Sequence, residues 1–444
     1  MANPRSAIQP FKARVFNFRL HILNAIIFLI TEPFSVKVAV IGLGKAGLPL
    51  ASVIAESGID VIGIDVDQNK CEAINQGINP IPEEAGLDEL VCRHGGKRLL
   101  ATPRYEDAKE VKDFIVIVPL FIDENCNPDY SILEGAFRNL GKILKPDDLV
   151  VLETTVPPGN TDGRIRSWLE EESDLKLGQF YLAHSPERIM TGLSISRLRE
   201  FPKITGGADE ESGRRALQLY SKFIPHIQPV SSARVAEFVK VIEGCYRDVN
   251  VALANELYKI AEELGIDFYE AREMANHQYC SIHLPSTGVG GHCIPVYPWF
   301  LVNEMERRER FNEVRLLRTA RELNDEMILY WAEKIILNCL KIGKPLRDVK
   351  ICLRGMTYRE GVKGLYHSRN LALARMLKEK GLSVFVCDEL LTDDEIESLG
   401  LKAMKPEDAD IVFDCFNLRF GREEACAIKI GPSELSSQPL MKSC

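Results

Sequence analysis

Apolar and polar residues follow strand and helix patterns in alternation from residue 36 onward. Residues 36–42, VKVAVIG, form a run rich in β-branched side chains, which is typical of a strand buried on both faces of a parallel sheet. A helical pattern follows at residues 47–58, GLPLASVIAESG. We predict further strands at 60–65, 113–118 and 148–154 and a helix at 68–76. This order predicts an α/β fold with a Rossmann-like, doubly wound parallel sheet.

The middle of the chain has a different pattern. Residues 233–264 contain no proline and repeat apolar side chains close to helical spacing, which predicts one long helix. A second helical stretch is expected at 313–340, and Gly343 and Pro345 then interrupt it. This part of the chain is therefore expected to be helical.

A second α/β pattern begins after that interruption. Strands are predicted at 349–354, 383–388 and 410–416 and a helix at 368–380. We therefore expect four parts: an extension at 1–34, a Rossmann-like α/β domain at 35–228, a helical central domain at 229–342 and a second Rossmann-like α/β domain at 343–444.

Composition excludes some classes of protein. The 444 residues include 55 Lys and Arg against 64 Asp and Glu, a net charge of −9, so we expect no nucleic-acid partner. The 12 cysteines include no CxxC pair, which favours reduced thiols in the cytoplasm over a disulfide framework or a zinc ribbon.

The N-terminal extension contains one apolar stretch, LHILNAIIFLI at Leu20–Ile30. It is shorter than the roughly 20 residues that a bilayer span needs, and His21 and Asn24 interrupt it. We predict no transmembrane helix and no membrane contact through residues 1–34. A loosely docked helix and an over-extended gene model are the favoured readings, with a weak signal peptide or an interfacial helix as alternatives.

A glycine-rich turn, GLGKAG at residues 42–47, follows the first strand directly and opens a helix. In this motif Gly42 permits a tight turn, Gly44 lets a pyrophosphate approach the backbone, and Gly47 allows close helix packing. Asp65 ends the second strand 18 residues after Gly47, where a carboxylate hydrogen-bonds a ribose 2′-hydroxyl and repels a 2′-phosphate. The glycine turn and Asp65 together favour NAD over NADP as the cofactor. The alternative is a glycine turn in a sheet protein that binds no dinucleotide.

Further motifs follow in a characteristic order: TTVPPGNT at 154–161, SPERIMTG at 185–192, AEFVKVIEGCYRDVNVALANEL at 236–257 and GVGGHCIPVYPWF at 288–300. Together with the glycine turn, they resemble the UDP-glucose/GDP-mannose dehydrogenase family over roughly residues 36–420, most closely its UDP-N-acetylmannosamine branch. The resemblance implies an NAD domain, a helical middle that dimerises and a C-terminal domain that holds UDP. The expected cofactor-binding residues are Gly42, Leu43, Gly44, Lys45, Ala46, Gly47, Asp65, Lys70 and Thr155.

The resemblance also assigns the chemistry. Cys293, on a glycine-rich turn, would attack the reacting carbon as a thiolate if nearby cations lower its pKa, whereas a lone cysteine is otherwise an inert core residue. Lys240 would lie at that carbon and stabilise an alkoxide. The alternative interpretation of Lys240 is a solvated lysine on a helix face. Glu187 would position the attacking water, and Thr155 would contact NAD near the nicotinamide, although either could be a turn residue.

For the UDP-sugar, the resemblance assigns a set of binding residues: Arg188, Ile189, Lys240, Arg247, His277, Gly290, Tyr358 and Arg359. A guanidinium suits the oxygens of a diphosphate, with exposed salt bridging as the alternative for Arg188 and Arg247. His277 is expected to reach the site of a neighbouring subunit. His277, Cys280, His283, His292 and Cys293 match no zinc spacing, so we expect no metal.

Several positions depart from the family pattern. The chain has Gly244 where the family usually has asparagine, Tyr297 where it has aspartate, and Thr191 where glucose-specific members have a second glutamate. These departures put oxyanion stabilisation and water activation in doubt unless Tyr297, His292 or a water substitutes. The C-terminal FKxxxDDxRESP pattern appears as residues 358–369, YREGVKGLYHSR, without its acidic pair.

These observations lead to one expected function and its alternatives. We expect a cytoplasmic, homodimeric, NAD-dependent enzyme that oxidises the C6 alcohol of UDP-N-acetylmannosamine to the uronate for a polysaccharide or glycan. The oxidation removes four electrons and passes through a thiohemiacetal and a thioester on Cys293. The alternatives are UDP-glucose or UDP-N-acetylglucosamine as substrate, or a UDP-sugar-binding homologue that has lost turnover.

Overall fold

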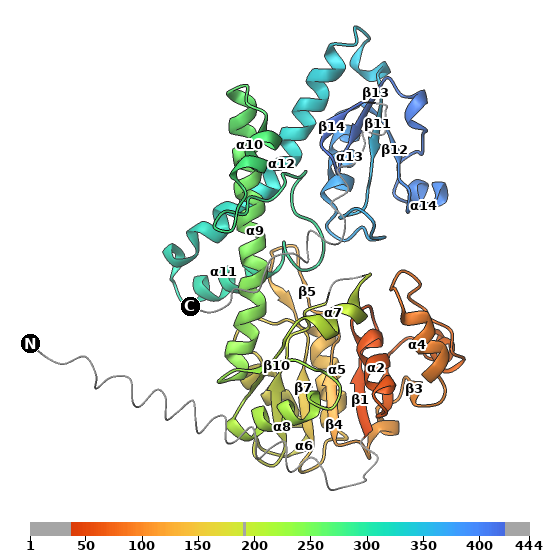
Figure 1. Ribbon diagram of the computed structural model, residues 1–444, viewed down its shortest axis with the longest axis vertical. Coiled ribbons are helices and arrows are strands. Elements are labelled where there is room, and N and C mark those ends of the chain that lie inside the picture. The colour runs from red at the N-terminus through yellow and green to blue at the C-terminus, as the bar shows by residue number, and fades with distance from the viewer. Residues whose placement is uncertain (1–36, 190–191, 422–444) are drawn as a thin grey trace, which may run out of the picture. The chain divides into compact units, whose positions relative to one another are not determined.

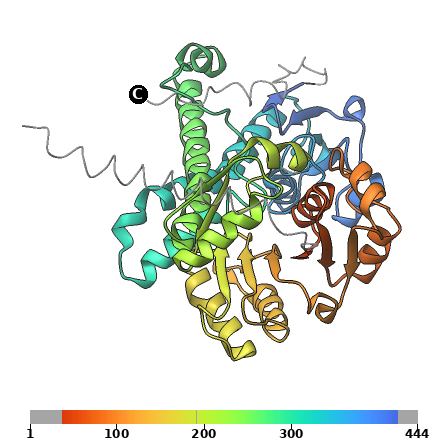
Figure 2. The ribbon, with the colours of Figure 1, turned by 60° about the horizontal axis from the view of Figure 1, so that its bottom comes forward.

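The larger of two main sheets has eight strands in the order β10-β9-β8-β7-β4-β1-β2-β3 (Figures 1 and 2). A computed structural model describes residues 37–189 and 192–421. The strands are β1 Lys37–Ile41, β2 Asp60–Ile64, β3 Leu99–Thr102, β4 Asp113–Val116, β7 Leu149–Leu152, β8 Tyr181–His184, β9 Lys203–Gly207 and β10 Ile227–Pro229. A small hairpin, β5 Phe121–Ile122 and β6 Pro128–Asp129, stands apart from this sheet.

The sheet is wound in two directions from β1. Strands β2 and β3 extend it one way and β4, β7 and β8 the other, all in parallel. Because crossovers between parallel strands are right-handed, the two halves place their helices on opposite faces. These helices are α2 Gly47–Glu56, α3 Gln68–Asn75, α4 Leu87–His94, α5 Ser131–Gly141, α6 Arg166–Ser173, α7 Ser194–Glu200 and α8 Glu210–Tyr220. The predicted doubly wound α/β fold is confirmed.

The far edge of this sheet differs from a purely parallel arrangement. Strand β9 pairs antiparallel with β8, through Ala183 opposite Gly207, and β10 then pairs parallel with β9. These strands are short, and the sequence pattern alone did not predict them.

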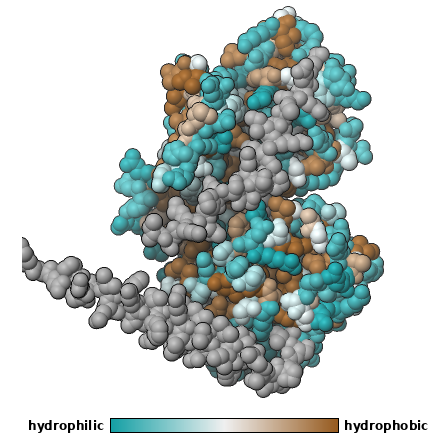
Figure 3. Space-filling view, in the orientation of Figure 1, coloured by the Kyte–Doolittle hydropathy of each residue, from teal (hydrophilic) through white to brown (hydrophobic). Residues whose placement is uncertain are grey.

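Two long helices follow. Helix α9, Ala233–Glu263, begins at Ser232, whose side chain accepts a hydrogen bond from the Val235 amide, and matches the predicted long helix. Helix α12, Arg315–Leu340, packs along it; the shorter α10 Phe268–Ala275 and α11 Tyr297–Arg307 lie between them in sequence. Figure 3 shows apolar residues exposed at the upper left, where α9 ends and α10 begins. Exposed there are Ile260, Leu264, Ile266 and Met274.

Buried polar groups fix α9 against α12. Arg321 donates to the Asp248 carboxylate at 2.6 Å, and both side chains are almost fully buried. Asn324 donates to the backbone oxygen and the carboxylate of Asp248, both at 3.0 Å. The two helices are thus joined in one register by groups that cannot separate without leaving a buried charge unpaired.

The smaller main sheet has the order β12-β11-β13-β14 and completes the second α/β unit. Its elements are β11 Lys350–Arg354, α13 Arg369–Glu379, β12 Ser383–Cys387, α14 Asp393–Ser398, β13 Ile411–Asp414 and the antiparallel β14 Arg419–Phe420. Trp331 of α12 packs on Phe413 with ring centroids 5.1 Å apart, so α12 contributes to this core.

The predicted extension at 1–34 lies outside the described residues. Among the residues that the structure describes, no helix is both long enough and apolar enough to cross a bilayer.

Candidate active site

A cavity of about 630 Å³ opens at the carboxyl ends of the parallel strands. Its floor comes from the turns after β1, β4, β7 and β8, and its walls come from α9, from the loop before α11 and from the loop after β11. The order of strands reverses between β1 and β4, the place where open α/β sheets bind their ligands.

The predicted fingerprint occupies one side of this cavity and fits a dinucleotide. An added Cβ on Gly42, which has φ +96°, would meet the Ile117 carbonyl oxygen at 2.8 Å, and one on Gly47 would meet the Gly42 oxygen at 1.8 Å. At Gly44 an added Cβ would meet nothing within 4 Å. Gly42 and Gly47 are therefore required for packing, while Gly44 leaves room in the cavity that a pyrophosphate can use at the start of α2.

Asp65 lies beside the fingerprint, as predicted. Its carboxylate accepts from the Leu43 amide at 2.9 Å and from the Lys70 ammonium at 3.0 Å. The carboxylate thus holds the turn after β1 against β2 and keeps further acceptor positions for a hydroxyl group. Lys45 and Ala46 line the cavity, and Lys45 pairs with Glu83 at 2.8 Å.

Cys293 and Glu187, two of the three residues predicted for catalysis, line the cavity. The third, Lys240, is not among the lining residues, but its ammonium lies 4.0 Å from the Glu187 carboxylate. The Lys240 side chain is only 12% exposed, which does not fit a solvated lysine on a helix face. Thr155 lines the same cavity and shares a hydrogen bond of 3.2 Å with the Tyr297 hydroxyl.

The environment of the Cys293 sulfur pushes its pKa in both directions. Burial raises the pKa of the thiol and is the largest effect. The Lys240 ammonium, a hydrogen bond from Tyr297 and, more weakly, Arg247 lower that pKa, while Glu187 raises it. The net pKa is raised, so the cations reduce the cost of forming a thiolate without making it the resting form.

Two guanidinium groups face the same cavity. Arg247 of α9 and Arg359 of the loop after β11 both line it, and burial together with the charge of Arg359 lowers the pKa of Arg247. Two neighbouring cations in a half-enclosed space favour an anion between them, and the oxygens of a diphosphate suit guanidinium geometry.

The loop before α11 approaches the second α/β unit closely. An added Cβ on Gly290 would lie 2.8 Å from the His367 carbonyl oxygen and 3.0 Å from the Cβ of Tyr358. The Gly291 amide donates to the Tyr366 oxygen at 3.0 Å. Glycine is needed at 290 because the backbone of this loop lies directly against the backbone of the loop after β11. Because of this close contact, Tyr358 lines the same cavity as Cys293.

Tyr297 and Gly244, two departures from the family pattern, are neighbours. An added Cβ on Gly244 would lie 2.4 Å from Cδ2 of Tyr297. Tyr297 is 7% exposed and its ring packs near Val241 and Phe300. The third departure, Thr191, lies outside the described residues.

Besides Lys240, two other predicted substrate residues do not line the cavity. Arg188 does not line the cavity; it donates to the Glu243 carboxylate at 2.5 Å and to the Pro202 oxygen at 2.9 Å, the salt-bridge alternative considered above. His277 is exposed in the turn after α10, where its backbone pairs with Cys280. Ile189, by contrast, lines the cavity.

Sequence reasoning missed some buried residues that shape the site. Glu237 accepts from the Thr161 amide at 2.7 Å and from its hydroxyl at 2.6 Å, which anchors the loop after β7 to α9. Glu153 lies at the buried floor of the cavity and pairs with Lys203 at 2.7 Å. Glu237 lies within the motif at 236–257 and Glu153 within the predicted strand at 148–154. Their burial in the fold distinguishes them from surface carboxylates, and the sequence alone does not show it.

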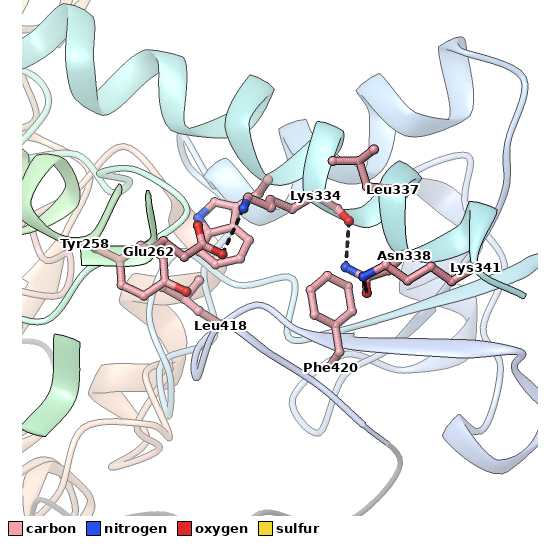
Figure 4. A pocket seen from close by; sticks show the side chains of 9 residues that line it. Tyr258, Glu262, Lys334, Leu337, Asn338, Lys341, Leu418 and Phe420 are labelled. Carbon is pink, nitrogen blue, oxygen red and sulfur yellow. Dashed lines mark hydrogen bonds and ion pairs between the residues drawn. The ribbon is translucent and has the colours of Figure 1, made fainter. Parts of the chain in front are cut away.

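A second, smaller pocket of about 380 Å³ lies between α9, α12 and β14 (Figure 4). Two of its charged groups, Lys334 and Glu262, pair with each other at 2.9 Å. It contains neither the glycine turn nor a thiol. Within the described ranges, no group of three or more His, Cys, Asp and Glu side chains is placed to hold a metal ion.

Comparisons with known proteins agree with this geometry. Residues 36–224 match the NAD-binding domain of the UDP-glucose/GDP-mannose dehydrogenase family, and residues 234–326 match its central domain. A UDP-N-acetyl-D-mannosamine dehydrogenase from Methanocaldococcus jannaschii is 36% identical over 85% of this chain and 84% of the relative. An NDP-N-acetyl-D-galactosaminuronic acid dehydrogenase from Ralstonia nicotianae is 34% identical over 79% of this chain and 82% of the relative.

Among solved structures, a UDP-D-ManNAc dehydrogenase from Pyrococcus horikoshii superposes with a TM-score of 0.77 at 31% identity, covering 86% of this chain and 96% of that one. With two family domains matched in order and the glycine fingerprint in place, the chain belongs to the UDP-glucose/GDP-mannose dehydrogenase family of NAD-dependent enzymes.

Proposed function

We propose that this protein oxidises the C6 alcohol of a UDP-hexosamine to the carboxylate, with UDP-N-acetylmannosamine as substrate and UDP-N-acetylmannosaminuronate as product. One observation carries the proposal: a single cavity contains the dinucleotide turn, the Cys293 thiol and two guanidinium groups. A dinucleotide, a covalent nucleophile and a site for a diphosphate are the three parts that this reaction needs.

The residues divide into those that bind and those that react. The turn at 42–47 and Asp65 would hold NAD, one molecule for each of the two successive oxidations, and each NAD would supply the hydride acceptor for one of them. Arg247 and Arg359 would hold the diphosphate of the sugar nucleotide. These contacts fix the sugar with its C6 carbon toward Cys293.

Lys240 and Cys293 then act on that carbon. The Lys240 ammonium stabilises the C6 oxygen as it loses its proton in the first oxidation. The Cys293 sulfur adds to the aldehyde carbon, and the thiol proton passes to the carbonyl oxygen, giving a thiohemiacetal. The second oxidation leaves a thioester, whose carbon–sulfur bond breaks when water, oriented by Glu187, attacks. The carboxylate departs and the thiol is restored.

The choice of sugar rests on relatives. The family members named above act on N-acetylated aminosugars by name, one on UDP-N-acetyl-D-mannosamine and one on an N-acetyl-D-galactosaminuronic acid nucleotide. This supports a hexosamine over UDP-glucose. Arg188 and His277 keep the roles that the resemblance implies only if the chain associates with another copy or closes further on its substrate.

The experiment is a substrate panel with purified enzyme and NAD. UDP-N-acetylmannosamine, UDP-N-acetylglucosamine and UDP-glucose are compared by kcat/KM, and each product is identified by mass and by NMR of its C2 configuration. The proposal predicts that UDP-N-acetylmannosamine is preferred at least about tenfold, a difference of about 1.4 kcal/mol in transition-state binding. Preference for another sugar would reject the substrate, and no NADH with any sugar would favour a binding protein without turnover.

We also propose that the chain forms a homodimer through α9. Its exposed apolar side chains Phe238, Ile242, Tyr246, Leu253 and Ile260 recur at intervals of four or seven residues, which places them along one face of the helix. A stripe of this kind on a 31-residue helix is suited to pairing with its own copy.

A further inference from the structure

Tyr297 and Gly244 form a matched pair in this chain. The ring of Tyr297 takes up the space where any side chain at 244 would project, since an added Cβ would come within 2.4 Å of Cδ2 and 3.1 Å of the tyrosine Cβ. The ring is part of α11 and cannot shift far, because it packs against Val241 and Phe300. The two departures from the family pattern are therefore one coupled change: a larger side chain at 297 requires glycine at 244.

The hydroxyl of Tyr297 lies between two polar groups of the active site. It donates to the Thr155 hydroxyl at 3.2 Å. Cys293 lines the same cavity and packs against the cluster that contains Tyr297, and hydrogen bonding from the Tyr297 hydroxyl lowers the pKa of the Cys293 thiol. Each hydroxyl has a single hydrogen, so when Tyr297 donates to sulfur, Thr155 can donate to Tyr297. All three groups are then satisfied when Cys293 is a thiolate.

We propose that Tyr297 is a catalytic residue of this enzyme, donating its hydroxyl hydrogen to the Cys293 sulfur in place of the amide and carboxylate that the family pattern leads us to expect at 244 and 297. The inference rests on the proposed function for its place in the reaction. The departures therefore replace one set of polar groups with another and do not mark a loss of turnover.

The surroundings of the sulfur make this donor important. Lys240 and Arg247, both from α9, favour the thiolate, while Glu187 after β8 and burial oppose it. Tyr297 adds a hydrogen bond without adding charge. Burial raises the pKa of Tyr297 well above its ordinary value, so its hydroxyl remains a donor across the range in which Cys293 titrates.

The test uses Tyr297→Phe, which keeps the ring over Gly244 and removes only the hydroxyl. Alkylation of Cys293 by iodoacetamide is followed by peptide mass spectrometry from about pH 6 to about pH 10, because the thiolate is the reactive form. We expect alkylation of Cys293 to slow about tenfold at every pH of this range that lies below its pKa, which corresponds to a rise of about one unit in that pKa. Tyr181→Phe, outside the cavity, serves as the control and should titrate like the wild type.

A second comparison tests the coupling between the two positions. Gly244→Ala should lower the melting temperature and disturb Cys293 alkylation when Tyr297 is present. Its effect should be clearly smaller in a Tyr297→Ser background, where the ring is gone and only the contact of 3.1 Å with the Cβ of residue 297 remains. An unchanged Cys293 titration in Tyr297→Phe, with a wild-type melting temperature, would overturn the inference. Equal effects of Gly244→Ala in both backgrounds would contradict the claim that the residue at 297 determines which residue fits at 244.

These readouts need neither NAD nor a sugar. If the wild type forms no NADH with any UDP-sugar while Tyr297→Phe still shifts the Cys293 titration, the proposed function fails and the hydrogen bond to sulfur stands. If the wild type forms the acid and Cys293 titrates alike in both proteins, Tyr297 alone loses its role.

Discussion

Cys293 depends on its neighbours for reactivity. Burial raises the pKa of its thiol, and Lys240 is the strongest of the groups that lower it. A cysteine in this setting is protected from indiscriminate oxidation at rest, since the thiolate is the form that reacts. Its activation is expected when substrate brings the reacting carbon within reach of the sulfur and of Lys240.

Replacing Cys293 with serine tests its covalent role. The variant should bind UDP-sugar and NAD with affinities within about threefold of wild type, because neither the guanidinium pair nor the glycine turn changes, and its acid formation should fall by a factor of about 10³ or more. Acid is measured by mass spectrometry and binding by calorimetry. The exposed Cys92→Ser is the control and should retain full activity. Undiminished acid from the Cys293 variant would contradict the covalent mechanism.

At this scale the motifs predicted much of the cavity. Cys293, Glu187, Arg247 and Arg359 were predicted as site residues, and the fold brings them to one cavity. Arg188 could not be placed from sequence, because its partner Glu243 lies 55 residues away and is brought near only by packing. Glu237 was missed for the same reason: no local pattern distinguishes a buried carboxylate from an exposed one.

The glycine turn between β1 and α2 separates packing from binding. Gly47 has no room for a side chain, whereas Gly44 faces open space. Alanine substitutions at different glycines of the motif are therefore expected to have different effects on stability and on NAD binding.

Gly44→Ala should retain the melting temperature of wild type but weaken NAD binding at least about tenfold, because a methyl group takes the space that the pyrophosphate needs. Gly47→Ala should destabilise the fold by about 2 kcal/mol or more, because its Cβ would overlap the Gly42 oxygen. Gly135→Ala on α5, which meets nothing within 4 Å, is the control for both. Thermal unfolding and NAD titration give the readouts, and a loss of stability in Gly44→Ala equal to that in Gly47→Ala would contradict this division.

Helix α9 is tied to the loop after β7 by a carboxylate that titrates near neutrality. Burial raises the pKa of Glu237 from 4.5 to about 7 despite its hydrogen bonds to Thr161 and Gly159. The folded state thus holds a proton that the unfolded chain releases. The stability from this group is fully present below about pH 4.5 and is lost as the pH rises through about 7.

Glu237→Gln stays neutral and should not lose that stability. Between about pH 5 and about pH 8, the free energy of unfolding of wild type should fall relative to the variant by up to about 3 kcal/mol. Urea unfolding at both pH values measures the difference. His184, whose pKa burial lowers to about 3, is present in both proteins, so its opposite pH dependence cancels. Parallel pH dependences in the two proteins would contradict the assignment to Glu237.

Elements differed in how well the sequence predicted them. The long helices and the fully buried strands carried strong periodic signals, and α9 and β11 lie within a residue or two of their predicted bounds. Strands β8 to β10 and the β5–β6 hairpin have two to five residues each, too few for a period to be distinct. The antiparallel pairing of β9 with β8 depends on contacts between residues far apart in sequence, and a local sequence pattern contains no information about such contacts.

At the scale of the whole molecule, we propose that the chain divides into functional regions at 35–228, 229–342 and 343–444. Helix α12 crosses this scheme, because its Met327, Trp331 and Ile335 pack in the core of the last region. The cavity draws residues from all three regions, so substrate binding and the relative placement of these regions are expected to be coupled.

Dimerisation through α9 makes a separate prediction. Leu253→Glu combined with Ile260→Glu places charge on the proposed stripe and should convert a dimer into a monomer of half the mass, measured by light scattering. Leu100→Glu, on the exposed side of β3, is the control and should remain dimeric. A wild-type chain that is already monomeric at micromolar concentration would contradict the proposal.

The count of NADH formed per molecule of UDP-sugar consumed tests the central claim most directly. Because the thiol and the dinucleotide share one cavity, the sugar is expected to stay bound to Cys293 between two oxidations. We predict two NADH for each UDP-N-acetylmannosamine and release of the acid without free aldehyde. One NADH with an aldehyde as the product would contradict the account.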